Sequence, residues 1–233
     1  MKTFVTILCW FIPFKKTRKQ LKQKYVKSIP IKYHHNNRIV IHLPDGKTIE
    51  NPYSIPGLSI HFAGRDSVIE LFYPINFHKS HFICRDNCSV IIKPSCFMGL
   101  TLDMYNECTV TIDENCQIGQ CHVNMPNERG TALYIERDCV FSTGIEIWTT
   151  DAHPISDMDG NCINNRKSCV TIGRHVWICR NATLLKGARI PANSIIGNSA
   201  VVSTKLVTEN SVYAGNPAIC VKSNINWSEG KIS

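Results

Sequence analysis

Hydrophobic residues recur at intervals of six through the second half of the chain. From Ile172 onward the sequence divides into the units IGRHVW, ICRNAT, LLKGAR, IPANSI, IGNSAV and VSTKLV. The first position of every unit is aliphatic: Ile172, Ile178, Leu184, Ile190, Ile196 and Val202. The fifth position is small or β-branched in Val176, Ala182, Ala188, Ser194 and Ala200, and Leu206 is the exception. Neither the helical period of 3.6 nor strand alternation produces this repeat, whereas a coil with flat sides of about six residues does.

Three sides of this length close a triangular coil of about 18 residues, and such coils stack into a prism through parallel backbone pairing. The aliphatic phase returns upstream with interruptions, at Ile92, Met98, Met104, Ile112, Ile118, Ile135, Phe141 and Ile147. The fifth positions of these units include Cys96, Cys108, Cys116 and Cys139, which we interpret as small side chains that point inward. The pattern therefore predicts an all-β protein built as a parallel solenoid.

The composition agrees with a globular chain. Of the 233 residues 43% are hydrophobic and 19% are charged, which excludes collagen-like, low-complexity and disordered material. No run reaches the roughly 18 to 20 apolar residues that a membrane-spanning helix needs. The 12 cysteines include no Cys-x-x-Cys pair, so we interpret them as reduced cytosolic thiols and expect no metal site.

The positive charge is concentrated at the N-terminus. The net charge is +8, but ten of the 26 basic residues precede Asp45, the first acidic residue. The rest of the chain has 16 basic and 18 acidic residues. We therefore expect no nucleic-acid partner. Residues 4–14 read FVTILCWFIPF and are followed by KKTRKQLKQK, an order opposite to that of a secretory signal. This segment predicts either a peripheral anchor on anionic lipids at the inner face of the membrane or a short helix packed on the body or a neighbouring subunit.

The hexapeptide run is followed by VYAGNPAICVK, and together they resemble the left-handed parallel β-helix acyltransferases from about Ile60 to Trp227. Within that family, TTDAHPI, VWIC and AGNPA are similar to the bacterial O-acetyltransferases that modify capsule and lipopolysaccharide sugars, including sialic acid. The resemblance implies a left-handed helix, acetyl-CoA as the donor, and a cytoplasmic homotrimer with active sites between neighbouring prisms. We expect three segments: an apolar-basic segment at 1–27, a cap at 28–59, and the β-helix at 60–227.

A polar segment interrupts the repeat between Ile147 and Ile172, and we expect it to leave the solenoid as a loop at about 150–169. His153 stands near its start, and the resemblance implies that it is the catalytic base. Acetyl transfer from a thioester to a hydroxyl needs a group that removes the hydroxyl proton and returns one to the thiolate, and imidazole can do both. Asp151 is expected either to orient this imidazole or its loop, or to form a turn by bonding its own backbone.

The resemblance also implies which residues contact the acetyl-CoA donor. Trp177 matches a tryptophan that lines the cleft at the acceptor and thioester end, and its alternative role is packing against the next subunit. The positions that match cofactor contacts are Arg180, Asn198, Lys205 and Lys222. Cys179 replaces a glycine of the related turn, and the spacing suggests an extra residue between Ser203 and Lys205.

Two other functions are compatible with a prism of this kind. The γ-type carbonic anhydrases bind a metal through three histidines between subunits, and His122, His153 and His175 are the candidates here. A trimeric scaffold without catalysis would use the N-terminal segment to dock a polysaccharide-assembly complex. The sequence does not identify the acceptor sugar.

Overall fold

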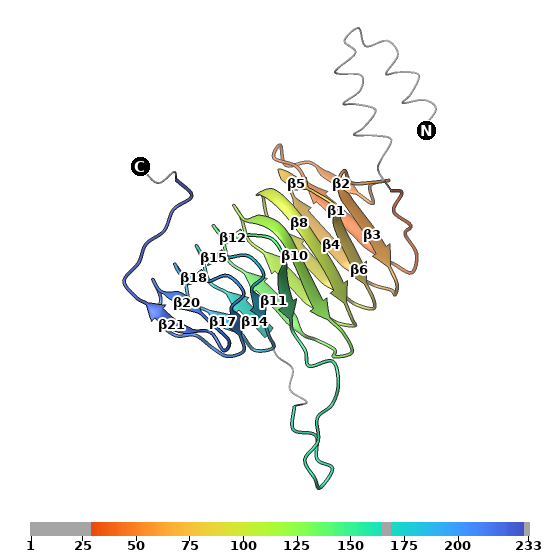
Figure 1. Ribbon diagram of the computed structural model, residues 1–233. Coiled ribbons are helices and arrows are strands. Elements are labelled where there is room, and N and C mark those ends of the chain that lie inside the picture. Colours follow the sequence, from red (N-terminus) through yellow and green to blue (C-terminus); the bar gives the residue numbers. More distant parts are fainter. Residues whose placement is uncertain (1–28, 165–168, 231–233) are drawn as a thin grey trace.

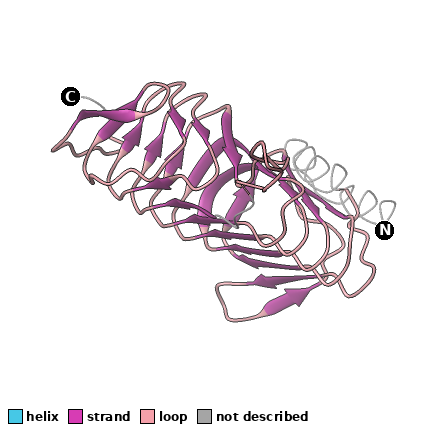
Figure 2. Ribbon diagram, turned by 90° about the horizontal axis from the view of Figure 1, so that it is seen from below, coloured by secondary structure: helices cyan, strands magenta, loops and turns pink. Residues whose placement is uncertain are grey.

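The computed structural model describes residues 29–164 and 169–230, which form a column of stacked coils (Figure 1). Its strands pair in parallel from one coil to the next, as the hexapeptide pattern predicts (Figure 2). The predicted apolar-basic segment at 1–27 lies outside the described residues. Across the described ranges, no helix has the length and apolar character that crossing a membrane requires.

Each complete coil contributes one strand to each of three faces. Face one contains β1 (Arg38–His42), β4 (Val68–Phe72), β7 (Ser89–Ile92), β9 (Thr109–Ile112), β11 (Ala132–Ile135), β14 (Cys169–Ile172) and β17 (Arg189–Ile190). Face two contains β5 (Ile75–Phe77), the first parts of β8 (Ser95–Met104) and β10 (Gln117–Met125), β12 (Val140–Phe141), β15 (Trp177–Ile178), β18 (Ile195–Ile196) and β20 (Val212–Ala214). Face three contains β3 (Leu58–Phe62), β6 (Ser80–Cys84), the second parts of β8 and β10, β13 (Ile145–Trp148), β16 (Thr183–Leu184) and β19 (Val201–Val202).

Strands β8 and β10 each cross from face two to face three. Both turn this corner at a glycine, Gly99 in β8 and Gly119 in β10. A Cβ atom on Gly99 would collide with the backbone oxygen of Gly119 in the next coil. The corner therefore needs glycine because the backbones of adjacent coils approach too closely for a side chain.

The core follows the predicted register. Ile172 pairs with Ile190, Ile178 with Ile196 and Leu184 with Val202, so each residue stacks on the residue 18 positions later. All six of these side chains are buried, and so are Cys108, Cys116 and Cys139. Cys96 is exposed, so the prediction that it points inward is wrong. It stands at the start of β8, where Ser95 is the buried residue, so the inward phase there is shifted by one.

The last coil is shorter than the others. Ile196 pairs with Tyr213, only 17 positions later, and Lys205 bridges to Arg189, 16 positions earlier. The expected extra residue between Ser203 and Lys205 is therefore wrong, because the corner there has lost residues. The column ends at β21 (Ile219–Lys222), which pairs antiparallel with β20.

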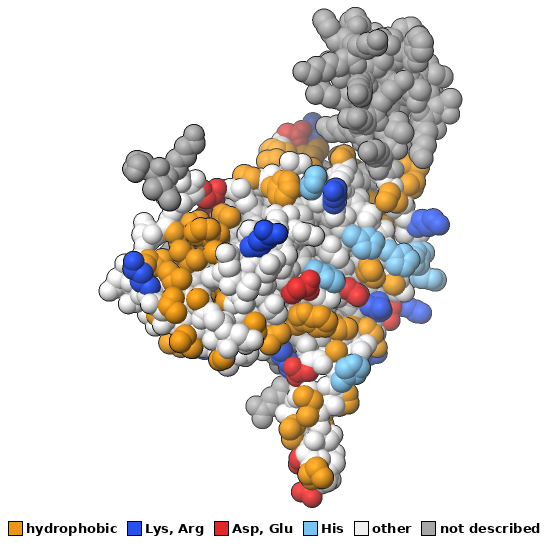
Figure 3. All heavy atoms as spheres, in the orientation of Figure 1, with side chains coloured by type: hydrophobic (Ala, Val, Ile, Leu, Met, Phe, Trp, Pro, Cys, Tyr) orange, Lys and Arg blue, Asp and Glu red, His pale blue; other side chains and the backbone are white. Residues whose placement is uncertain are grey.

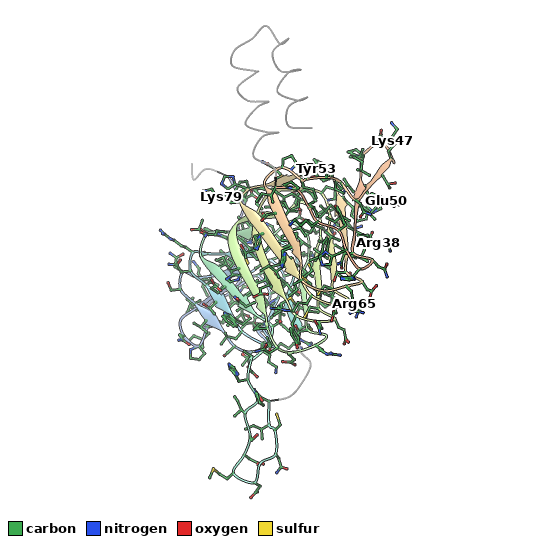
Figure 4. The ribbon with its side chains drawn as sticks, turned by 90° about the vertical axis from the view of Figure 1, so that its right-hand side faces the viewer. Arg38, Lys47, Glu50, Tyr53, Arg65 and Lys79 are labelled. Carbon is green, nitrogen blue, oxygen red and sulfur yellow. The ribbon has the colours of Figure 1, made fainter. Side chains whose placement is uncertain are left out.

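The opposite end of the column begins inside the segment that the sequence analysis sets apart as a cap. Strand β1 pairs in parallel with β4 and antiparallel with β2 (Thr48–Glu50). Figure 4 shows the turn end of this β1–β2 hairpin standing out from the prism, with Lys47 and Glu50 near that end and Arg38, the first residue of β1, lower down. Segment 38–50 thus supplies the first rung of face one and an antiparallel edge strand that closes it.

Candidate active site

One long loop leaves the prism at the corner between face three and face one. Ile135 pairs with Ile172, 37 positions later, although neighbouring coils need only 18. The surplus residues extend away from the column after Thr150, and they form a narrow arm in Figures 1 and 3. We call residues 151–164 the histidine loop. Its position agrees with the break in the hexapeptide pattern, because residues without an inward aliphatic phase have no place in the stack.

The tip of the histidine loop is a small polar turn. Ser156 and Cys162 form an antiparallel bridge, and between them the Asp157 carboxylate accepts hydrogen bonds from the backbone N–H groups of Asp159 and Asn161. The Asn161 side-chain amide donates to the same carboxylate over 3.0 Å. These hydrogen bonds, led by the one from the Asn161 side chain, lower the pKa of Asp157.

A pocket of about 200 Å³ lies where the histidine loop joins the prism. Its walls include His153, Cys162 and Asn164 from the loop. Glu128 comes from the same corner in the preceding coil, and Lys186 comes from that corner in the following coil. The pocket is therefore formed by three successive passes of the chain around one corner of the prism.

Lys186 lies at the centre of the polar contacts in this pocket. Its ammonium group donates to the Asn164 backbone oxygen over 2.7 Å, to Asp151 Oδ2 over 3.1 Å and to Glu128 Oε2 over 3.3 Å. The Lys186 side chain is only 14% exposed and that of Glu128 only 17%. Partial burial weakens solvent screening, so these ion pairs count for more than pairs on an open surface.

Asn164 closes the base of the loop. Its amide nitrogen donates to Asp151 Oδ2 over 3.0 Å and to the backbone oxygen of His153 over 2.9 Å. Its amide oxygen accepts a hydrogen bond from the backbone N–H of Ile155 over 2.7 Å. Both polar atoms of this side chain are thus occupied by the residues that surround His153.

His153 follows a tight turn. Its backbone N–H donates to the Asp151 carbonyl over 2.7 Å, and Ala152 between them has a φ of 63°. An i to i+2 hydrogen bond at positive φ marks the rarer, strained form of the γ-turn. Alanine seldom adopts this conformation, and such outliers concentrate at functional sites. The imidazole ring lines the pocket and is exposed, and within the described residues no hydrogen bond to the ring is found.

Asp151 does not bind the imidazole. Its side chain receives hydrogen bonds from Lys186 and Asn164, and its backbone carbonyl forms the turn. Among the roles expected for Asp151, these contacts correspond to ordering of the loop and not to direct contact with the His153 ring.

Trp177 lies on face two, away from the pocket of the same chain, and its side chain is 39% exposed. The segment after β21 runs back along this face, and Trp227 lies with its ring centre 5.9 Å from that of Trp177. Trp227 also stacks on His175 at 4.2 Å and donates its indole N–H to the His175 carbonyl. Within one chain, the structure therefore separates the two side chains expected to face the acceptor.

The four residues expected at the cofactor fall into separate places. Arg180 and Asn198 occupy equivalent positions of successive coils at the corner between faces two and three, and both are exposed. Lys222 stands on the terminal strand β21, and Lys205 stands beside Arg189 at face one. Cys179, next to Arg180, is partly buried, and this burial raises the pKa of its thiol.

The three histidines considered for a metal also lie apart. His122 is on face three, 3.6 Å from Glu146, whereas His175 is at the corner between faces one and two. In the described part of a single chain, no three His, Cys, Asp or Glu side chains are grouped closely enough to hold a metal ion.

Sequence reasoning did not find Glu128, Asn164, Lys186 or Trp227. Lys186 occupies an outward position of LLKGAR, where a solvated lysine is the ordinary expectation. Asn164 is one of several polar residues in the loop, and nothing local distinguishes it. Their roles arise from the stacking of coils, which brings residues 128, 151, 164 and 186 to one corner.

Comparison with known proteins identifies relatives for this chain. The polysialic acid O-acetyltransferase of Neisseria meningitidis is 39% identical over 131 residues, which are 56% of this chain and 60% of the relative. The polysialic acid O-acetyltransferase of Escherichia coli O1:K1 is 34% identical over 93 residues, which are 40% of this chain and 30% of that relative. The chain thus spans at most about 60% of the length of these two relatives. No family model matches the sequence.

Solved structures extend the similarity to the fold. The polySia-specific acetyltransferase NeuO matches with a TM-score of 0.72 at 23% identity, covering 85% of this chain and 87% of that one. The polysialic acid O-acetyltransferase OatWY matches with a TM-score of 0.57 at 25% identity, covering 86% of this chain and 93% of that one. These matches confirm the left-handed parallel β-helix and the resemblance to the hexapeptide-repeat acyltransferases.

Proposed function

We propose that this protein is an acetyl-CoA-dependent O-acetyltransferase acting on a sugar hydroxyl of a bacterial surface polysaccharide. The homology to polysialic acid O-acetyltransferases supports the reaction and makes sialic acid polymers the first acceptors to test. The observation that carries the proposal is the exposed imidazole of His153, set beside a polar pocket at the base of the loop that interrupts the prism.

His153 is the general base in this proposal. Its imidazole removes the proton of the acceptor hydroxyl while the oxygen attacks the carbonyl carbon of the thioester. The tetrahedral intermediate collapses as the carbon–sulfur bond breaks, and the imidazolium returns the proton to the departing thiolate. The products are the acetyl ester and free coenzyme A, so no further reactant is needed.

A homotrimer completes the site. Trp177 and His153 lie on different parts of one chain, so a cleft lined by both requires neighbouring prisms to pack together. The exposed ring of Trp177 would then form an apolar wall near the thioester, which limits access of water. Size determination by light scattering tests this requirement, because a strictly monomeric active enzyme would exclude it.

Coenzyme A is the donor substrate, and its phosphates need cations. Arg180 and Asn198 are stacked on one corner and could contact successive parts of one extended ligand, and Lys205 and Lys222 supply two further candidates near the end of the column. We place the protein in the cytoplasm, where acetyl-CoA is available, with peripheral membrane contact through residues 1–27.

The test is acetyl transfer from acetyl-CoA to polysialic acid, followed by mass spectrometry of the product. His153→Ala should lower the rate by about 10²- to 10⁴-fold while the protein folds as before, because general-base catalysis contributes this much. His61→Ala is the control, since His61 is also exposed but lies on β3, away from the pocket. Normal turnover by His153→Ala would refute the assignment of the base.

A further inference from the structure

We infer that Asn164 and Lys186 are positioning residues that hold His153 in its reactive place, an inference that rests on the proposed role of His153. Neither residue binds the imidazole. Asn164 binds the backbone at His153 and Ile155 and the side chain of Asp151, and Lys186 joins both stems of the histidine loop to the prism.

The histidine loop is attached to the prism by a few side-chain hydrogen bonds at its base. Among the described residues, these come from Lys186, which binds Asp151 and Asn164, from Asn127, which reaches the Ala152 carbonyl over 3.4 Å, and from Thr150, whose hydroxyl oxygen accepts from the Ala152 N–H over 3.0 Å. The large apolar side chains of the loop are exposed: Ile155 is 52% exposed, Ile163 is 60% exposed and Met158 is fully exposed. An apolar core therefore does not hold the loop, and its position depends on the few polar contacts at its base.

A lysine is suited to this place because its ammonium group has three N–H donors and no acceptor. Three acceptors converge on it: Glu128 from one pass of the chain, and Asp151 and Asn164 from the histidine loop. Glu128 contributes a buried counter-charge, and its other oxygen, Oε1, is buried without a hydrogen-bond partner. The Glu128 carboxylate therefore depends on Lys186, and an apolar side chain at 186 would leave that charge unpaired.

Asn164 cannot be replaced by aspartate without loss of hydrogen bonds. Its amide nitrogen donates two of them and its amide oxygen accepts from the Ile155 N–H and the Cys162 thiol, and a carboxylate has no donor for the first two. Aspartate at this position would also place a second negative charge beside Asp151. Misplacing a catalytic group by about 1 Å is enough to lower the rate about 10²-fold, so loosening of this turn should appear directly in turnover.

The experiment compares Asn164→Asp with Asn161→Asp. The control makes the same chemical change in the same loop, since the Asn161 amide also donates to a carboxylate, that of Asp157 at the tip. We expect Asn164→Asp to lower kcat about 10²-fold with the KM for acetyl-CoA unchanged within about twofold, and Asn161→Asp to leave both unchanged. Amide hydrogen exchange supplies a readout independent of catalysis: His153 and Ile155 should exchange faster in Asn164→Asp, and the strands of the prism should not.

Lys186 is tested by Lys186→Met and Lys186→Arg. Methionine keeps the length of the side chain without the charge, so kcat should fall as in Asn164→Asp, and arginine should restore part of it because it again supplies donors. If Lys186→Met fails to fold because Glu128 is left unpaired, Glu128→Gln combined with Lys186→Met removes both charges. This double variant should fold and still have low kcat and fast exchange at His153.

The outcomes separate this inference from the proposed function. Wild-type kcat and exchange in Asn164→Asp and in the Lys186 variants, together with an inactive His153→Ala, would overturn the positioning roles alone. An active His153→Ala would overturn the proposed base. In that case, faster exchange at His153 in Asn164→Asp would still show that Asn164 and Lys186 order the loop.

Discussion

The coils between Cys169 and Val202 and the histidine loop between Asp151 and Asn164 adjoin each other, but different forces hold them. Every coil buries an aliphatic residue at each face and joins its neighbours through backbone hydrogen bonds. The loop exposes its apolar side chains and relies on hydrogen bonds from a few polar ones.

This difference separates stability from activity. In the prism the same contact is repeated in coil after coil, so the stack tolerates many changes on its outer surface. In the loop each polar contact occurs once, so the loss of one can displace the residue next to it. We expect substitutions in the coils to change the free energy of unfolding, and substitutions at the base of the loop to change turnover with little effect on unfolding.

The largest expected effect on stability comes from a core isoleucine. Ile178 is fully buried on face two, and Ile178→Ala should reduce the free energy of unfolding by about 2 to 5 kcal/mol through lost burial and the cavity left behind. Ile163→Ala is the matched control in the loop, where the side chain is 60% exposed, and it should change stability by less than about 0.5 kcal/mol. Chemical denaturation measures both. Equal losses in the two variants would show that the loop packs against a surface of this or another chain.

The same contrast explains how far the sequence could be interpreted. The aliphatic phase from Ile172 to Val202 predicted the register to the residue, because inward positions in a solenoid obey a local rule. The end of that rule also predicted the loop. Cys96 was wrongly predicted to point inward because the repeat was extended upstream without a change of phase at the interruptions. A shift of one residue reverses which side chain is buried.

The site itself was only partly predictable. His153 was predicted as a site residue because TTDAHPI resembles a known motif, and in the structure it lines a pocket. The contacts of Lys186 with Glu128 and Asn164 span 58 and 22 positions in the sequence, and no local sequence pattern predicts such contacts. The ring of Trp227 lies beside that of Trp177, 50 positions away in the sequence, because the segment after β21 returns along face two. Contacts between distant segments depend on coil stacking and on where the irregular segments run.

A smaller effect is expected at Ala152, which adopts positive φ immediately before His153. In Ala152→Gly, relief of this strain opposes the greater freedom of glycine in the unfolded chain, so the free energy of unfolding should change by less than about 1 kcal/mol. Turnover should fall several-fold because the backbone of the turn that orients His153 gains conformational freedom. Ala63→Gly, at a position without positive φ, should lose about 0.5 to 1 kcal/mol with unchanged turnover. Unchanged turnover in Ala152→Gly would show that the strained turn does not contribute to positioning.

The smallest effect concerns the tip of the loop, where hydrogen bonds lower the pKa of Asp157. The folded turn stabilises the ionised carboxylate of Asp157 relative to the protonated group. The resulting stabilisation of the turn is therefore present above the unfolded pKa of about 3.9 and is lost as the pH falls through the lower folded pKa. Amide chemical shifts of Asp159 and Asn161 should therefore move as the pH falls below the ordinary value of about 3.9, while those of His153 and Ile155 should not follow this transition. Asp157→Asn should abolish the movement at the tip. If the tip and base amides titrated together, the loop would be one cooperative unit, and the division between a polar tip and an anchored base would be wrong.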